Sequence, residues 1–399
     1  MIMTKARIAA TYVYTLDSAE PIRNGFVEYD EETGRILSVG ECHEGDADDI
    51  IDGALVPGFV NAHCHVELSH LHKKFIKGTG MAGFIDQINA LRDWAGREKK
   101  AELVRIWMDK MWNDGVSAMA DISNDDSSFE VKKDHKLYTR TFLEVFGSEP
   151  EMCDGVMADV RGLEDIARKT GIDAAPTPHS CYTMSPRLLS ESAAAGLEAG
   201  FLSYHSQESQ EEEDLLRYGS GAMYENRKRS GMSTPPVTGE SSLKYFIDRL
   251  AAVRPAPYDG HILLVHNVCL SQEDIDAAKK VMKNVYWAVC PLSNIFIHDA
   301  LPPIPLMRAN GLDIMVGTDS LSSNDDLDMV KEMTCIHDNF PEVPMSEILT
   351  WACLNGARFL KRENELGSLT PGKVPGIVLV RAIDENGKFT HDSCSERII

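Results

Sequence analysis

Short apolar or β-branched runs alternate with amphipathic, helix-like stretches through the middle of the chain. Stretches such as "FIDQINALRDWAG" and "LKYFIDRLAAV" have apolar residues at helical spacing and separate most of the runs. Eight strands that alternate with helices predict an α/β fold with a parallel sheet, and eight is the number that closes a (β/α)8 TIM-type barrel. The eight runs are residues 54–65, 115–123, 140–147, 172–180, 201–208, 261–268, 285–293 and 312–320.

Most of these runs start apolar and end on a side chain that can take part in chemistry. Four of the eight ends carry histidine, namely His63 with His65, His179, His205 and His266. Loops that simply follow a strand would be rich in Asn, Gly and Ser instead. Barrel enzymes place their active site at the C-terminal face of the strands, so the pattern predicts a site at that face. The other four runs end on Asp121, Glu144, Ser293 and Asp319.

Both ends of the chain have a different pattern, in which short alternating stretches are separated by Gly and Asp. They predict a small antiparallel β unit, and we expect a β-sandwich domain built from residues 1–52 and 370–399. The barrel domain would then span residues 53–369. The longest insertion, residues 209–242, combines an acidic stretch with a loose one, and we expect it to cover the mouth of the barrel.

Composition narrows the classes of partner. The formal net charge of −22 over 399 residues argues against nucleic acid and against anionic membranes, because phosphate binding needs clustered Lys and Arg. We find no apolar run of about 18 residues, as a membrane span requires. The N-terminal stretch reads as a strand, and the nine cysteines include no CxxC pair. We therefore expect reduced thiols and a cytoplasmic location.

His63 and His65 are two residues apart on a predicted strand, so their side chains share one face while Cys64 faces away. Two neutral imidazoles on the inner face of a barrel suit a transition metal ion. His205, His266 and Asp319 end later strands and are further candidate ligands. A single histidine among thirteen is more often structural, so the prediction depends on the combination. A catalytic metal site uses three or four protein ligands and keeps one position open.

Five stretches carry a resemblance to a known family: "VPGFVNAHCH", "YHSQE", "LVHNV", "CPLSN" and "VGTDSLSSNDDLDM". They resemble the amidohydrolase superfamily of metal-dependent (β/α)8 hydrolases. Within it they are similar to the aminohydrolases of purine-type rings, such as S-adenosylhomocysteine, methylthioadenosine and aminofutalosine deaminases. The resemblance covers nearly the whole chain. It implies that the metal is held by His63, His65, His205 and Asp319.

The same resemblance assigns catalytic roles. It implies that Glu208 is the acid/base carboxylate and that His266 lies near the attacked carbon. Asp319 would also take the proton of the attacking water. Dinuclear members use a carbamylated lysine at the end of the fourth strand, but that strand ends here in "PTPHSCYT", without lysine. We therefore expect one divalent metal, zinc first, with iron or manganese as alternatives.

The resemblance also suggests residues around the substrate. His179, in "PTPHSCYTMSP", would contact substrate, with a packed histidine as the alternative. Ser293 and Asn294 would shape the pocket floor. Glu67 would line the pocket or cap the following helix. We expect Arg92 to be a solvated residue of an amphipathic helix, with a contact to a substrate tail as the alternative. Residues expected to brace Asp319 are Ser320, Ser323 and Asn324.

The predicted function is hydrolytic deamination of an amino-substituted heterocycle, with release of ammonia. A 6-aminopurine nucleoside or derivative comes first, and the stretch after the ligands is closest to the aminofutalosine-deaminase-like members. Alternatives are guanine, cytosine or triazine aminohydrolases, a chlorohydrolase, a dinuclear cyclic-amide hydrolase, and a metal-bound barrel without turnover. We expect a small-molecule substrate and a homo-oligomer, namely a dimer.

Overall fold

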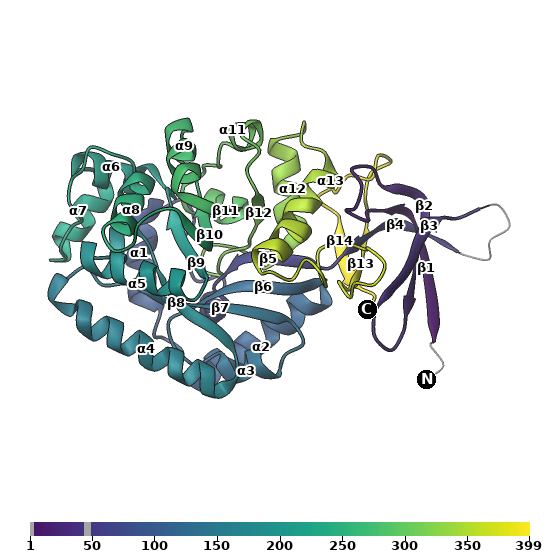
Figure 1. The fold of residues 1–399 in the computed structure, drawn as a ribbon, viewed down its shortest axis with the longest axis horizontal. Helices are drawn as coiled ribbons and strands as arrows, with labels where there is room; N and C mark the ends of the chain where they lie inside the picture. The colour runs from purple at the N-terminus through teal and green to yellow at the C-terminus, as the bar shows by residue number, and fades with distance from the viewer. Residues whose placement is uncertain (1–3, 44–48) are drawn as a thin grey trace.

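The computed structural model describes residues 4–43 and 49–399, and its strands form three sheets (Figure 1). Two of them are four-stranded and parallel, with strand orders β5-β6-β7-β8 and β12-β11-β10-β9. The strands of the first are β5 (Phe59–Cys64), β6 (Val116–Ser123), β7 (Tyr138–Val145) and β8 (Asp173–Pro178). Those of the second are β9 (Phe201–Ser206), β10 (Tyr258–His266), β11 (Met282–Val289) and β12 (Ile314–Val316).

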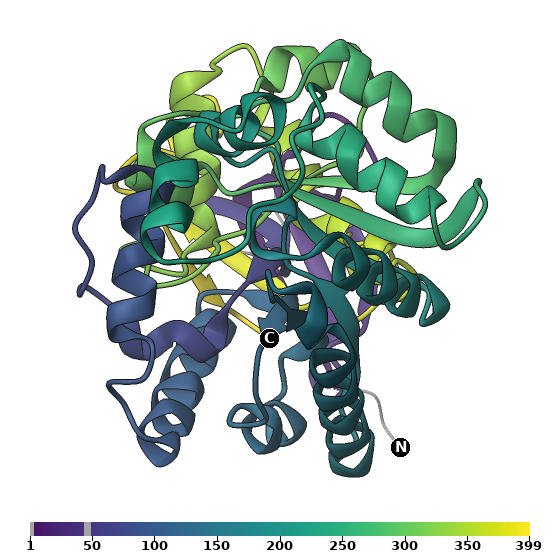
Figure 2. The same cartoon turned by 90° about the vertical axis from the view of Figure 1, so that its left-hand side faces the viewer.

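Burial explains why these strands appear as nearly continuous apolar runs. Every residue of β5 and of β6 is buried, as expected for parallel strands that are covered on both faces. Figure 2 shows helices arranged around the parallel strands. The helices are α1 (Gly80–Leu91), α2 (Arg97–Asn113), α3 (Phe129–Asp134), α4 (Cys153–Thr170), α5 (Pro186–Glu198), α6 (Gln210–Tyr218), α7 (Gly221–Arg229), α8 (Ser242–Ala251), α9 (Gln272–Val281), α10 (Pro291–His298), α11 (Ile304–Ala309), α12 (Met329–Asn339), α13 (Met345–Thr350) and α14 (Gly356–Phe359). Short turns of other helix types are η1 (Val66–Leu71), η2 (Pro150–Met152), η3 (Cys181–Thr183) and η4 (Trp351–Asn355).

Local signals in the sequence set several helix ends. The side chain of a serine accepts a hydrogen bond from a backbone N–H in the first turn of four helices, which satisfies a donor that the helix itself leaves free. Glycines in the left-handed conformation follow α4 and α6, at Gly171 (φ 90°) and Gly219 (φ 61°). The four capping serines are Ser185, Ser209, Ser241 and Ser271.

The two parallel sheets approach each other along two seams. At the first, the backbone N–H of His205 donates to the carbonyl of His179 at 2.9 Å. At the second, the N–H groups of Thr318 and Asp319 donate to the carbonyl of His63 at 3.1 and 3.0 Å. A Cβ at Gly317 would lie 2.8–2.9 Å from backbone and Cβ atoms of His63, so only glycine permits this approach. The predicted α/β class is confirmed.

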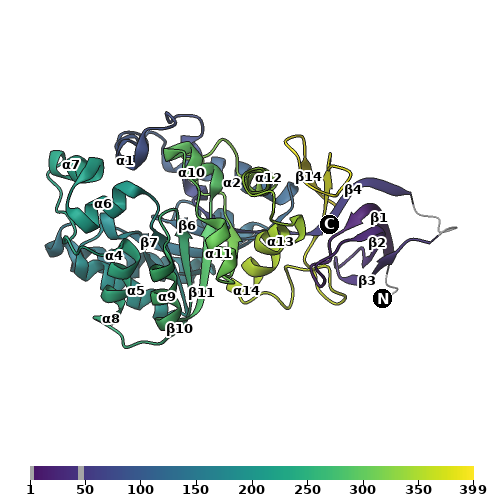
Figure 3. The ribbon, with the colours of Figure 1, turned by 90° about the horizontal axis from the view of Figure 1, so that it is seen from above.

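The third sheet joins both ends of the chain and lies at one end of the molecule (Figures 1 and 3). Its order is β14-β13-β4-β1-β2-β3, and the pairing of β1 with β4 is parallel, unlike the antiparallel arrangement that we predicted. The described residues of the two chain ends form this one sheet, and no second sheet packs on it among them. The β-sandwich therefore stays a prediction. The strands are β1 (Lys5–Val13), β2 (Ile22–Asp30), β3 (Ile36–Glu41), β4 (Ile50–Pro57), β13 (Ile377–Arg381) and β14 (Cys394–Arg397).

The first predicted barrel run, residues 54–65, is divided between two sheets. Its first part belongs to β4 of the terminal sheet, and only Phe59–Cys64 forms β5. The division falls at Gly58, where a Cβ would lie 2.4 Å from the carbonyl oxygen of Pro375. Over residues 4–43 and 49–399, no helix has the length and apolar character needed to cross a membrane.

Candidate active site

Three predicted ligands, His63, His65 and His205, come together at the C-terminal ends of β5 and β9. The Nε2 atom of His65 lies 3.1 Å from Nε2 of His63 and 3.2 Å from Nε2 of His205. Two ligand atoms on one tetrahedral metal, each at about 2.0–2.1 Å from it, are about 3.3 Å apart. The three imidazoles therefore have the spacing that a single metal ion requires.

Asp319, which follows β12, supplies the fourth group. Its Oδ1 lies 3.7 Å from Nε2 of His63 and 3.6 Å from Nε2 of His65. Its other oxygen, Oδ2, accepts hydrogen bonds from the hydroxyls of Ser293 at 2.6 Å and Ser323 at 2.7 Å. The two serines therefore fix the carboxylate with Oδ1 directed at the histidines.

The protonation states of these groups fit a metal site. Burial, above all, lowers the pKa of His63, His65 and His205, so the rings are neutral at pH 7 and offer lone pairs. Burial alone would raise the pKa of Asp319, but the nearby imidazoles and the Ser293 hydroxyl outweigh it and hold the pKa below its usual range. The donor set, three neutral imidazoles and one carboxylate, suits a divalent transition metal ion.

A second possible group of ligands consists of Glu144, His179 and His205. It would use Nδ1 of His205, which lies 3.2 Å from the carbonyl oxygen of His179 and 3.5 Å from Oε1 of Glu144. A hydrogen bond from Nδ1–H to that carbonyl leaves the lone pair on Nε2, where His63 and His65 converge. The geometry therefore favours the first group and makes Glu144 and His179 its outer partners.

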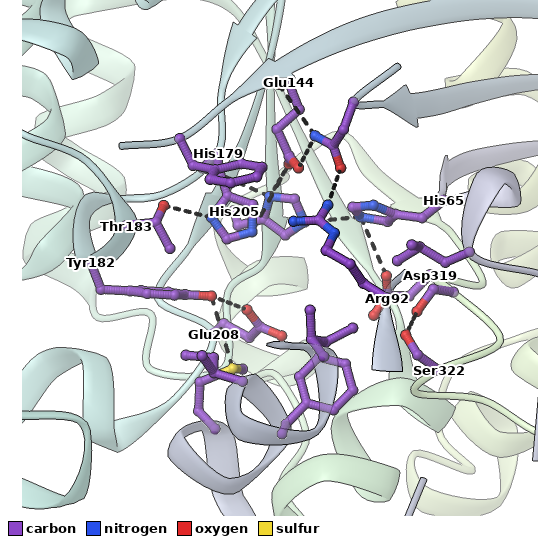
Figure 4. A pocket seen from close by; sticks show the side chains of 18 of the residues that line it. His65, Arg92, Glu144, His179, Tyr182, Thr183, His205, Glu208, Asp319 and Ser322 are labelled. Atoms are coloured by element: carbon purple, nitrogen blue, oxygen red, sulfur yellow. Dashed lines mark hydrogen bonds and ion pairs between the residues drawn. The ribbon is translucent and has the colours of Figure 1, made fainter. Parts of the chain in front are cut away.

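Glu208 and His266 face each other beside the ligand cluster. Oε1 of Glu208 lies 3.5 Å from Nε2 of His266, and the Tyr182 hydroxyl donates to Oε2 of Glu208 at 3.3 Å (Figure 4). Burial, followed by the charges of Asp319 and Glu212, raises the pKa of Glu208 well above its ordinary value. The raised pKa favours the protonated form of this carboxyl group, which can act as an acid.

The hydrogen bonds of His266 define its tautomer. The side-chain amide of Asn294 donates to Nδ1 of His266 at 3.2 Å, so the neutral ring carries its hydrogen on Nε2. Nε2 is buried and has no hydrogen-bond partner among the described residues. Burial lowers the pKa of His266 to about 4, which keeps the ring neutral at pH 7. An N–H donor is thus available toward the cavity.

Four non-glycine residues with left-handed backbone lie at the strand ends that carry the site. Such conformations are uncommon and costly, and they persist where the surrounding structure enforces them. They redirect the chain at the ends of β9, β10 and β12, and two of the four, His266 and Asp319, line the pocket. The residues are Gln207 (φ 51°), His266 (φ 74°), Asn267 (φ 58°) and Asp319 (φ 57°).

The cluster opens into a pocket of about 790 Å³, counting the part that is open to solvent. One wall is apolar and comes largely from α1 and the turn before it, and the opposite side is polar (Figure 4). The apolar wall includes Leu68, Met81, Phe84, Ile85 and Ile88. Predicted site residues that line the pocket are His65, His179, His205, Glu208, His266, Asp319 and Ser320.

Three predicted substrate contacts lie behind the pocket wall. Ser293 and Asn294 are fully buried and bond Asp319 and His266, so they support those side chains and do not form the floor. Glu67 is also buried, and both of its oxygens accept from the backbone N–H of Asn124 at 2.9 Å. None of the three is among the described residues that line the pocket.

The residues expected to brace Asp319 differ in what they contact. Ser323 bonds the carboxylate directly, whereas the Ser320 hydroxyl contacts that of Ser323 at 3.2 Å. Asn324 does not bond Asp319; its amide donates to the carbonyl of Thr318 at 3.0 Å and to Glu332 at 2.7 Å. Asn324 therefore stabilises the backbone that precedes Asp319.

Arg92 was expected in solvent, but its side chain lines the pocket (Figure 4). Its Nη2 donates to Oδ1 of Asn124 at 3.0 Å. Sequence analysis also missed Asn124 and Tyr182. Tyr182 lies in the "HSCYT" stretch that was noted for His179. Its position just after the fourth predicted strand could have indicated that it belongs to the site. For Arg92 the available signal was one cation after a helix whose pocket-facing side is mostly apolar.

The insertion at residues 209–242 supplies none of the described residues that line the pocket, contrary to the predicted cover. It contains α6 and α7, which pack against α1 (Figure 3). The Glu211 carboxylate accepts from the N–H groups of Met81 at 3.1 Å and Ala82 at 2.9 Å, and Asn226 donates to Asp86 at 2.8 Å. The insertion thus holds the helix that forms the apolar wall.

Comparison with known proteins shows the family to which the chain is similar. Residues 54–399 match the model of the amidohydrolase family. The chain is 27% identical over 364 residues to a 5-methylthioadenosine/S-adenosylhomocysteine deaminase of Moorella thermoacetica, covering 84% of this chain and 75% of that protein. It is 27% identical over 319 residues to an adenosine deaminase of Helicobacter pylori, covering 78% and 76%. A crystal structure of Helicobacter pylori aminofutalosine deaminase is similar in fold, with a TM-score of 0.77, 22% identity, and coverage of 99% and 100%.

Proposed function

The chain belongs to the amidohydrolase family, and on that premise we propose that it is a metal-dependent aminohydrolase. Its proposed reaction is the hydrolytic removal of the exocyclic amino group of a 6-aminopurine nucleoside or derivative, with release of ammonia. The observation that carries the proposal is the convergence of three Nε2 atoms and Oδ1 of Asp319 beside the facing pair of Glu208 and His266. The deaminase names of the relatives support the same reaction.

The proposal includes a single metal ion held by His63, His65, His205 and Asp319. Zinc is the first choice, and iron or manganese would accept the same ligands. When bound, the metal lowers the pKa of a water toward about 7 and so supplies hydroxide at neutral pH. No lysine is among the described residues that line the pocket, which supports one metal instead of a lysine-bridged pair.

The side chains then divide the proton transfers. Glu208 starts protonated and donates to the ring nitrogen next to the amino-bearing carbon, which makes that carbon electrophilic. Asp319 starts ionised, takes one proton of the attacking water and passes it to the departing amine, and the second proton returns to Glu208 as the carbonyl forms. His266 directs its Nε2–H toward the oxygen that gains negative charge. Tyr182 keeps the Glu208 carboxyl oriented through its hydrogen bond.

We also propose how the sheets are arranged into domains. We infer that the two parallel sheets close into one (β/α)8 barrel over residues 53–369, supported by the hydrogen bonds at both seams. Residues 1–52 and 370–399 form the second unit. A cytoplasmic homodimer remains a prediction.

Replacing Glu208 by Gln tests the function. We expect the rate of ammonia release from aminopurine nucleosides to fall about 10²- to 10⁴-fold while the metal content stays near one per chain. A Glu198→Gln variant, changed at an exposed carboxylate at the end of α5, serves as the control and should keep full activity. A wild-type protein that binds metal and nucleosides but releases no ammonia from any amino-heterocycle would overturn the proposal.

A further inference from the structure

Asp121 and Lys132 form a buried ion pair beside the candidate ligands, and the proposed reaction uses neither of them. We propose, on the premise of the metal site in the proposed function, that this pair consists of positioning residues for His65. Asp121 ends β6 as the ligands end their strands, but neither member of the pair is among the described residues that line the pocket. Their action on the site therefore passes through the backbone, at the peptide group that joins His65 to Val66.

The backbone ladder between β5 and β6 does not fix His65. Its register shifts between Asn61 and Cys64, and its last pair places Cys64 opposite Asp121. His65 and Val66 follow this last pair and have no partner in the ladder. Another contact must therefore hold the chain where the second imidazole of the ligand cluster leaves the strand.

The carboxylate of Asp121 makes that contact. Its Oδ1 accepts a hydrogen bond from the backbone N–H of Val66 at 2.9 Å. Val66 is the first residue of η1, where a backbone N–H has no partner within the turn itself. Since this N–H belongs to the peptide group that follows His65, the hydrogen bond restricts the backbone of His65 and with it the direction of the imidazole.

The ion pair leaves Oδ1 of Asp121 available for this purpose. The Nζ atom of Lys132 lies 2.5 Å from Oδ2, the other oxygen, and donates to the hydroxyl of Ser123 at 2.6 Å. Both charged side chains are 0% exposed. Burial of two charges removes their hydration, so such a pair stabilises a fold little more than apolar side chains of the same size would. Placement of an acceptor at Val66 accounts for the pair better than stability does.

A second carboxylate ties the same two segments together in the opposite direction. Both oxygens of Glu67, on η1, accept from the backbone N–H of Asn124 at 2.9 Å, just after β6. Because Glu67 keeps η1 attached to the end of β6, we expect replacement of Asp121 to leave the fold intact. The effect should be confined to the peptide group after His65.

Two double variants isolate the hydrogen bond from the buried charges. Asp121→Asn with Lys132→Met removes both charges but keeps a carbonyl oxygen that can accept from Val66, while the new amide faces the hydroxyl of Ser123, 3.4 Å from Oδ2. Asp121→Leu with Lys132→Met removes the charges and the acceptor together. Zinc affinity is measured by competition with a chelator. We expect it to stay within about threefold of wild type in the asparagine variant and to fall about 5- to 30-fold in the leucine variant.

Two further readouts distinguish positioning from a purely structural role. The visible absorption of the cobalt-loaded proteins reports the geometry of the ligands, and urea titration of the metal-free proteins reports the stability of the fold. We expect the cobalt spectrum of the asparagine variant to match wild type and that of the leucine variant to differ. Equal zinc affinities and equal spectra in the two variants would overturn the proposal, whatever their stabilities.

The remaining outcomes are also decisive. If the leucine variant does not fold, Asp121→Val with Lys132→Leu replaces it, and the same results support or overturn the proposal. A wild-type protein that binds no metal would overturn the proposed function and the positioning role with it. Metal binding by wild type with equal affinities in the two variants would overturn the positioning role alone.

Discussion

Replacing Ser293 by Ala should weaken metal binding without unfolding the protein. The serine hydroxyl donates to Oδ2 of Asp319 at 2.6 Å and is fully buried, so water does not replace it. A hydrogen bond to a charged group contributes about 1.5–3 kcal/mol. Because Ser323 still holds the same oxygen, we expect the loss near the lower end, about 10- to 30-fold in metal affinity.

The assay is a competition between the protein and a chelator of known affinity, read by metal analysis of the separated protein. Zinc and manganese are measured separately, because the identity of the metal is part of the proposal. Ser322→Ala is the matched control, since its hydroxyl contacts Ser320 and not Asp319. The reasoning is refuted if Ser293→Ala binds both metals like wild type while Asp319→Ala loses them.

Three further changes test other parts of the structure. Gly317→Ala should lower the free energy of unfolding by about 1–3 kcal/mol, because the added Cβ would meet His63. The control Gly162→Ala, on an open face of α4, should not lower it. Urea titration compares the two variants. Glu211→Gln should raise KM about 2- to 10-fold with little change in kcat, because it weakens the hydrogen bonds that the carboxylate accepts from the first turn of α1. An unchanged KM together with unchanged amide exchange in α1 would contradict this expectation. Burial, followed by the adjacent carboxylate, raises the pKa of Glu212 to about 7, so its ionisation destabilises the fold as pH rises from about 4.5 to 7. Glu212→Gln should therefore gain stability relative to wild type over that interval, on the order of 3 kcal/mol at most, and a pH-independent difference between the two unfolding curves would refute the cause.

The parallel strands and a group of candidate ligands could be predicted from spacing, whereas the set of four ligands came from the family resemblance. A strand alternates its side chains, and parallel strands bring their C-terminal ends to one face, so the candidates His63, His65, His205, His266 and Asp319 were identified without coordinates. The mixed terminal sheet was missed in part, because the parallel pairing of β1 with β4 joins strands that are not neighbours in the chain.

Side-chain direction at the ends of elements could not be predicted in the same way. Ser293 and Asn294 begin a helix, where a shift of one residue changes the direction by about 100°. They were therefore placed on the pocket floor, although they support Asp319 and His266 from behind. Arg92 was placed in solvent because helix periodicity does not reveal which neighbour covers the end of α1.

The contact between α1 and the insertion joins positions far apart in the chain, since Met81 and Glu211 are 130 residues apart. Neither segment belongs to the two parallel sheets whose strands carry the candidate ligands. Paired substitutions in these two segments can consequently change the substrate preference while the residues that carry the reaction stay the same. Laboratory selection for a new substrate should accumulate its first changes there, and transplanting one segment without the other should give a folded but poorly discriminating catalyst.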